Sequence, residues 1–101
     1  MPFAVEFDGV VLEGFVDLLI ETADGFEIVD WKTDQIAPQK VAERLRDYEL
    51  QAGLYVLGIE SATGRSVSSV TYVFASAGVE TSPGEPSQLA QMARAQLAKD
   101  S

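Results

Sequence analysis

The hydrophobic pattern in the first third of the chain is that of β-strands. Residues 3–7 alternate between apolar and polar positions and stop at Asp8-Gly9, a common turn pair. A second turn signal separates residues 10–21, which are rich in Val, Leu, Ile and Phe, from residues 26–32. Because these two longer runs carry apolar residues on both faces, they predict a three-stranded meander whose sheet is covered on both sides.

Helical periodicity follows over residues 39–61. Leu50, Leu54 and Leu57 recur at helical spacing and mark one apolar face of this predicted helix. A second face of the same helix combines polar and aromatic side chains. Its members are Arg44, Tyr48, Gln51 and Tyr55.

The last third of the chain predicts one more strand and one more helix. Residues 67–75 contain the β-branched and aromatic side chains that are typical of strands. Residues 87–99 predict a terminal helix with Ser87 as its N-cap. With 101 residues, the chain is long enough for one hydrophobic core and too short for two domains.

The absence of two residue types narrows the chemistry that the chain can perform. The sequence contains no Cys, so it can form no disulfide, thiol nucleophile or iron–sulfur cluster. It also contains no His, which excludes imidazole-bound zinc and a Ser-His-Asp triad. Any metal ion must therefore be held by oxygen atoms.

Acidic residues dominate the charge of the chain. The net charge is -9, and nine of the 16 acidic residues lie within residues 1–34 beside a single base. A hydrophobic content of 47% excludes a disordered chain, and the acidity by itself argues against an electrostatic DNA clamp. The apolar runs are too short to span a membrane and the first residues lack a targeting signal. We therefore expect a soluble cytoplasmic protein without a membrane partner.

The candidate chemistry lies at the end of the third predicted strand. Asp30 and Lys32 are two residues apart in a strand, so their side chains share one face, about 6.5 to 7 Å apart along it. The intervening turn folds Asp17 back beside them, and if the register places it opposite or diagonal to Asp30, the two carboxylates require a cation. Oxygen ligands favour Mg²⁺ or Mn²⁺. A metal-bound water beside Lys32 is suited to the hydrolysis of a phosphate ester.

Three segments, in this order along the chain, resemble a known nuclease family. They are residues 14–17 (GFVD), 28–34 (IVDWKTD) and 48–55 (YELQAGLY). Together they resemble the PD-(D/E)XK nuclease domain at the C-terminus of RecB-like and AddA-like bacterial helicase–nucleases, over roughly residues 3–75. The resemblance implies an α/β (α+β) fold with a restriction-endonuclease-like core, a mixed β-sheet of about four strands flanked by helices. Residues 1–101 would form a single nuclease-like domain of a larger helicase–nuclease chain.

The resemblance also assigns roles at the end of the third predicted strand. Asp17 and Asp30 would be ligands of Mg²⁺ or Mn²⁺, with the main-chain carbonyl of Trp31 as a third. Lys32 would be the catalytic lysine. The side chain of Trp31, on the opposite face from Asp30, is expected in the core or in an interface.

A helix motif completes the implied site. Gln51 and Tyr55 match the Gln-x-x-x-Tyr motif of the family, which supports the lysine and contacts DNA, so Gln51 joins the catalytic set. Tyr48, on the same helix face, is either a further DNA contact or a helix-packing aromatic. Arg44 is either a contact to DNA phosphates or an ordinary solvated charge.

The activity that the resemblance implies is that of a magnesium-dependent deoxyribonuclease, an exonuclease rather than an endonuclease. The parent enzyme would be an ATP-dependent helicase–nuclease in double-strand break repair and recombination. The implied partners are DNA, the helicase motor domain and a partner subunit.

One departure from the family pattern leaves alternatives open. The family carries a helix before the first strand that brings a His or Glu to the metal, whereas only Met1-Pro2 precede Phe3 here. We therefore expect a piece of a longer polypeptide with weak or no activity on its own. One alternative is a catalytically inactive module that binds DNA or serves as a scaffold in a repair complex. Another is a generic α+β interaction domain, which requires Asp17 and Asp30 to point to opposite faces.

Overall fold

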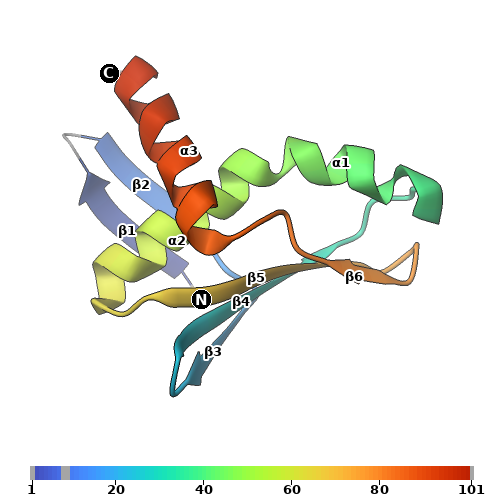
Figure 1. The fold of residues 1–101 in the computed structure, drawn as a ribbon, viewed down its shortest axis with the longest axis horizontal. Coiled ribbons are helices and arrows are strands. Elements are labelled where there is room, and N and C mark those ends of the chain that lie inside the picture. Colours follow the sequence, from blue (N-terminus) through green and yellow to red (C-terminus); the bar gives the residue numbers. More distant parts are fainter. Residues whose placement is uncertain (1, 8–9, 101) are drawn as a thin grey trace.

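A mixed four-stranded sheet supports the rest of the structure (Figure 1). The computed structural model describes residues 2–7 and 10–100. The strands lie in the order β3 (Leu18–Thr22), β4 (Gly25–Lys32), β5 (Val67–Phe74) and β6 (Val79–Thr81). Strands β4 and β5 are parallel, whereas the two outer pairs are antiparallel. The predicted α+β fold with a mixed sheet of about four strands is confirmed, and β6 is a short strand that the sequence pattern did not predict.

A hairpin stands apart from this sheet. Its strands, β1 (Pro2–Phe7) and β2 (Val10–Phe15), pair antiparallel and form a separate two-stranded sheet. The prediction of one continuous strand over residues 10–21 is therefore wrong, because the chain bends at Asp17 between β2 and β3. Val16 is fully buried at this bend. The bend thus anchors an apolar side chain in the core and releases Asp17 from the strand ladder.

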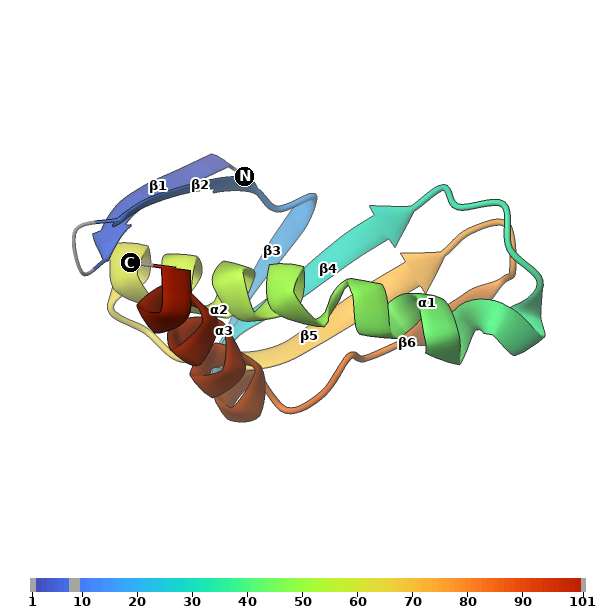
Figure 2. The ribbon, with the colours of Figure 1, turned by 90° about the horizontal axis from the view of Figure 1, so that it is seen from above.

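Three α-helices cover one face of the four-stranded sheet (Figures 1 and 2). A 3-10 turn (Pro38–Lys40) leads into α1 (Val41–Asp47), α2 (Glu49–Thr63) and, after β6, α3 (Pro86–Asp100). Helix α2 contacts α3, β5 and both strands of the hairpin. The core therefore lies between α2 and the inner face of the sheet. No helix in the described part of the chain has the length and apolar character needed to cross a membrane.

The helix predicted over residues 39–61 is broken at Tyr48, whose φ of -101° and ψ of 0° interrupt the helical path. After this break, the predicted leucine face is confirmed in part, because Leu57 is 2% exposed and Leu54 packs against the core, but the opposite face of α2 is buried as well. Leu50 is 40% exposed, whereas Tyr55 is only 7% exposed. The face that the sequence marked as polar and aromatic therefore points toward the sheet.

Helices α2 and α3 approach each other closely at Gly53. A Cβ atom at this position would collide with the main-chain carbonyl of Leu89 and press against the side chain of Ala93. Helix α3 itself begins at Pro86. Proline suits the first helical turn, because the main-chain nitrogens there donate no hydrogen bond within the helix and the missing N–H of proline costs nothing. The prediction of Ser87 as the N-cap is therefore wrong, since Ser87 lies inside the helix.

The three α-helices leave the outer face of the four-stranded sheet, the lower side in Figure 1, uncovered. Leu18, Ile20 and Trp31 alternate outward from β3 and β4 and are 39%, 39% and 48% exposed. The predictions of a sheet covered on both sides and of a core position for Trp31 are wrong within this chain, whereas an interface position for Trp31 stays a prediction. The reason is that all three helices lie on the opposite face.

Candidate functional site

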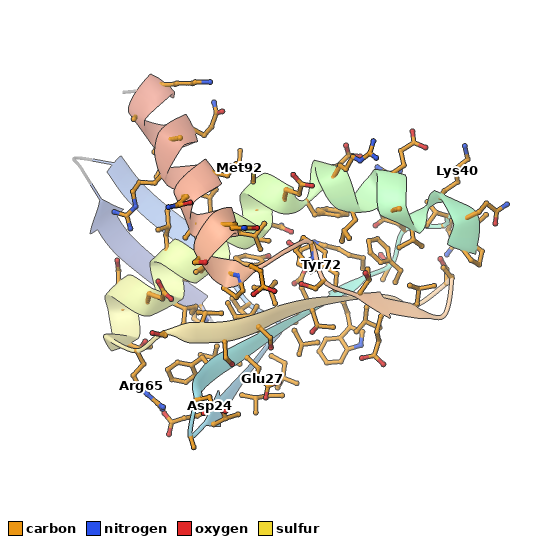
Figure 3. The ribbon with its side chains drawn as sticks, viewed as in Figure 1. Asp24, Glu27, Lys40, Arg65, Tyr72 and Met92 are labelled. Carbon is orange, nitrogen blue, oxygen red and sulfur yellow. The ribbon has the colours of Figure 1, made fainter. Side chains whose placement is uncertain are left out.

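The polar side chains gather where the carboxyl end of β4 meets the break between α1 and α2. Strand alternation turns Asp30 and Lys32 inward, toward the helices, and turns Glu27 to the opposite face. Figure 3 shows Glu27 on the side of the sheet away from the helices and Tyr72, from β5, on the side toward them. Asp30 is only 4% exposed. A buried charge of this kind requires a compensating partner.

The carboxyl groups of Asp17 and Asp30 lie within hydrogen-bonding reach of each other, since each acts on the pKa of the other through such a contact. The bend at Asp17 makes this possible. Pairing of β3 with β4 begins at Leu18, opposite Val29, and the carboxylate of the preceding Asp17 accepts the Trp31 N–H at 2.9 Å. The side chain thus replaces a strand partner that the ladder no longer provides. An interaction domain with these two carboxyls on opposite faces is excluded by this contact.

The two carboxyl groups have pKa values displaced in opposite directions. The hydrogen bond from the Trp31 N–H lowers the pKa of Asp17 below its ordinary value. Burial raises the pKa of Asp30, although the nearby Lys32 ammonium acts against this rise. A cation beside the pair would stabilise the ionised form of both groups.

Lys32 occupies a pocket of oxygen atoms and aromatic rings. Its Nζ lies 2.6 Å from Asp30 Oδ2 and donates a hydrogen bond of 2.9 Å to Gln51 Oε1. The centroids of the Tyr48 and Tyr72 rings lie 4.2 and 5.2 Å from the same nitrogen. Cation–π contacts of this kind stabilise a partly desolvated ammonium. The lysine nitrogen is therefore directed toward the Asp30 carboxyl group and the Gln51 side chain.

Gln51 is in turn held by β5. The hydroxyl of Tyr72 donates a hydrogen bond of 2.8 Å to Gln51 Oε1, the same oxygen that receives Lys32. Burial raises the pKa of Tyr72 far above its ordinary value, so this hydroxyl keeps its proton. Sequence reasoning did not find Tyr72, because its role depends on the pairing of β5 with β4, where Tyr72 lies opposite Asp30.

Tyr55, one helical turn after Gln51, lies beneath the site. Its ring packs edge-on against Phe3, with centroids 6.3 Å apart. Burial, aided by the negative charges of Asp30 and Asp17, raises the pKa of Tyr55 to about 12. Tyr55 is thus a neutral hydroxyl close to the two carboxyls, with little of its surface open to solvent.

Asp34 and Arg44 join the site from the flanking loop and from α1. The hydroxyl of Tyr48 donates to both carboxylate oxygens of Asp34, at 3.1 and 3.0 Å, and Arg44 Nε lies 3.2 Å from Asp34 Oδ2. Sequence reasoning included Asp34 in the segment 28–34 that resembles the nuclease family but assigned it no role. The available signal was its position two residues after Lys32, together with the shared helix face of Arg44 and Tyr48.

The donor atoms of the site fit a hard divalent cation. Asp30 Oδ2 is buried and accepts no well-aligned hydrogen bond from any described residue, although Lys32 Nζ is an ion-pair partner 2.6 Å away. Among the residues that the structure describes, no group of three or more His, Cys, Asp or Glu surrounds a common point. The protein would therefore supply two carboxylates, and Mg²⁺ readily keeps several waters when so few protein ligands are present.

Known proteins are similar to this chain in sequence. The sequence model of the PD-(D/E)XK nuclease superfamily matches residues 1–100. An ATP-dependent helicase/nuclease subunit of Carboxydothermus hydrogenoformans is 43% identical over 67 residues, which cover 65% of this chain and 6% of that protein. A protein of the same name from Thermoanaerobacter sp. (strain X514) is 33% identical over 66% of this chain and 5% of its own length. Another, from Moorella thermoacetica, is 32% identical over 70% of this chain and 5% of its own length.

The chain thus spans 5 to 6% of the length of these curated relatives. No solved structure matches it significantly.

Proposed function

The chain belongs to the PD-(D/E)XK nuclease superfamily, and we propose that it is a domain that hydrolyses DNA phosphodiester bonds with Mg²⁺ or Mn²⁺. The observation that carries the proposal is the joint placement of Asp17, Asp30 and Lys32 at the end of β4. Two carboxyl groups in mutual contact, with an ammonium 2.6 Å from one of them, form a compact acidic and basic centre. Such a centre provides the ligands and the proton donor that metal-assisted hydrolysis requires.

Asp17, Asp30 and the main-chain carbonyl of Trp31 would hold the cation. The N–H and C=O groups of a strand residue point to the same edge, and the Trp31 N–H points to Asp17. This geometry supports the Trp31 carbonyl as a third oxygen ligand. When bound, a divalent cation lowers the pKa of water and stabilises the charge that develops on the phosphate.

Lys32 is the residue that would act on the water or on the phosphate. An ammonium has three donors, and here one is directed to Asp30 and one to Gln51. The third donor is available to a water molecule or to a phosphate oxygen. Gln51 fixes the direction of the ammonium, so Asp17, Asp30, Lys32 and Gln51 form the proposed catalytic set.

DNA would be delivered to this site by other parts of a longer enzyme. The relatives are named as components of an ATP-dependent helicase/nuclease, which supports delivery of the strand by a helicase motor domain and a partner subunit. Exonuclease action in repair and recombination is part of the proposal. The proposed contacts to the DNA strand are Gln51, Tyr48 and Tyr55. Because the net charge of -9 repels DNA, the domain would depend on partner proteins to bring DNA to it in the cytoplasm.

A cleavage assay tests the proposal. Asp30→Ala and Lys32→Ala, introduced into the full helicase–nuclease, are expected to abolish Mg²⁺-dependent DNA hydrolysis while helicase activity is retained. Glu27→Gln is the matched control, because Glu27 lies on the same strand but faces away from the helices. Unchanged cleavage by Asp30→Ala would sink the assignment.

A second candidate function keeps the fold without catalysis. Among the described residues, no third carboxylate joins Asp17 and Asp30 in a position to share a metal ion. This small ligand set favours an inactive nuclease-like module that binds DNA or supports a repair complex. Isothermal titration with Mn²⁺ separates the two functions. A catalytic site takes up the ion and loses it in Asp17→Asn, whereas a scaffold shows no specific uptake in either protein.

A further inference from the structure

A chain of polar contacts lies directly behind Lys32. Arg44 Nε is 3.2 Å from Asp34 Oδ2, and Asp34 accepts the hydroxyl of Tyr48 on both of its carboxylate oxygens. The ring of Tyr48 then lies against Lys32, with the ammonium nitrogen 4.2 Å from the ring centroid. The contacts thus run from a surface arginine to the lysine of the proposed site.

The main chain of Asp34 is anchored from two sides. Its carbonyl accepts the hydroxyl of Ser76 and, at 3.1 Å, the N–H of Ile36. The carbonyl of Lys32 accepts the N–H of Ala75 at 3.2 Å. The turn after β5 therefore fixes the loop after β4, and the Asp34 carboxylate projects from a defined position.

Tyr48 depends on Asp34 for its own orientation. It lies at the break between α1 and α2, with dihedral angles outside the helical region, so no continuous helix holds its side chain. Its ring also contacts Tyr72 edge-on, with centroids 5.4 Å apart. The two hydrogen bonds to Asp34 hold the hydroxyl end of the ring, while Tyr72 contacts the ring itself.

Loss of the Asp34 contact would release the hydroxyl end of the Tyr48 ring without removing any direct partner of the ammonium. The ring would then be held by its packing against Tyr72 and Phe74. The oxygen partners of Lys32 are Asp30 and Gln51, and neither of them contacts Asp34 in the structure. Only the aromatic wall beside the ammonium would change. A small displacement of a reacting group can nevertheless reduce a rate strongly.

We propose that Asp34 is a positioning residue for Lys32: it holds the Tyr48 hydroxyl, and thereby the aromatic ring that limits where the lysine ammonium can lie, while Arg44 holds Asp34. The consequence for DNA cleavage rests on the proposed function. The position of the lysine is a property of the folded chain and can be measured with or without activity.

Nuclear magnetic resonance of the chain with labelled lysine tests the positioning. Protons on the carbon next to the Lys32 nitrogen are shielded by the Tyr48 ring, so their resonance lies upfield of that of the exposed Lys40. Asp34→Ala and Tyr48→Phe are each expected to move this resonance toward the Lys40 position, and the double variant is expected to move it no further. Asp47→Ala is the matched control: Asp47 is the other carboxylate near Arg44, at 3.6 Å, and its loss is expected to leave the resonance unchanged.

Cleavage in the full helicase–nuclease gives the second readout. Asp34→Ala is expected to lower kcat by about tenfold to a hundredfold with KM unchanged. Tyr48→Phe is expected to lower kcat by a similar factor, and the double variant to lose no more in kcat than either single one. An unmoved Lys32 resonance in a folded Asp34→Ala or Tyr48→Phe chain, or additive losses in kcat, would overturn the proposal. Absence of any cleavage by the wild-type enzyme would instead refute the proposed function, and the lysine resonance would still decide the positioning role. Tyr48→Phe removes a single oxygen, so the test stands even where Asp34→Ala does not fold.

Discussion

At the scale of single residues, the site is defined by two carboxyl groups in unlike surroundings. Asp17 accepts a main-chain hydrogen bond that lowers its pKa, whereas burial raises the pKa of Asp30. Asp17 is therefore stable as an anion, whereas keeping Asp30 ionised lowers the free energy of unfolding of the chain. Functional sites commonly carry such a cost, because the arrangement that binds a ligand is not the one that folds best alone.

This cost predicts that Asp30→Asn stabilises the chain in the absence of metal. At pH 7 the variant has no buried carboxylate to keep ionised, so its Tm should rise by about 2 °C or more. The sign follows from the raised pKa of Asp30. Above that pKa the ionised Asp30 carboxylate destabilises the fold. Below the ordinary pKa of 3.8 the effect disappears, because Asp30 is then protonated in both the folded and the unfolded chain. Thermal unfolding in a chelator at pH 7 and near pH 3 measures the difference. A lower Tm for the variant at pH 7 would show that the ionised Asp30 stabilises the fold instead.

Residue patterns predicted part of this site and missed the rest for a physical reason. The period of two in a strand places Asp30 and Lys32 on one face, and helical spacing places Tyr48 and Gln51 together. The roles of Asp34 and Tyr72 depend instead on contacts between separate elements. Such contacts follow from strand register and loop path, which local periodicity does not contain.

At the scale of elements, two interruptions build the site. The predicted strand over residues 10–21 and the predicted helix over residues 39–61 are each broken, at Asp17 and at Tyr48. Both patterns are continuous in hydrophobicity, so neither carries a signal of its break. In each case a side chain at the break points into the site, which indicates that tertiary contacts outweigh local propensity there.

The packing of α2 on α3 predicts that Gly53→Ala destabilises the fold. Alanine favours a helix over glycine by about 1 kcal/mol, but its methyl group would meet the Leu89 carbonyl, and such overpacking costs about 1 to 3 kcal/mol. The net loss should lower the Tm, by roughly 4–8 °C for each kcal/mol. Ser61→Ala, at an exposed position of the same helix, is the control and should change the Tm little. An unchanged Tm for Gly53→Ala would show that the two helices can separate without cost.

At the scale of the whole molecule, the net charge and the open face of the sheet are the features that bear on the proposed delivery of DNA by a partner. The net charge is -9, and the outer face of the sheet leaves Leu18, Ile20 and Trp31 open within this chain. The acidity repels a phosphate backbone except where a cation neutralises the carboxyls. The domain is therefore suited to receive DNA from a partner rather than to capture it.

This charge predicts weak binding of DNA by the chain alone. Nonspecific DNA-binding proteins reach dissociation constants of about 10⁻⁴ to 10⁻⁶ M at physiological salt through basic residues. The 101-residue chain should bind more weakly than this range in fluorescence anisotropy with a labelled single strand. Saturable binding at micromolar protein concentrations without metal would refute the dependence on a partner.

The place at which a divalent cation binds decides whether the two aspartates form a metal site. Mn²⁺ added to the isotopically labelled chain broadens the resonances of nearby nuclei. We expect the amide of Trp31, which donates to Asp17, and the side chain of Lys32 to broaden first, and Asp17→Asn to abolish this effect. Broadening that spreads evenly over exposed acids such as Asp47, or that persists in Asp17→Asn, would contradict a metal site built on Asp17 and Asp30.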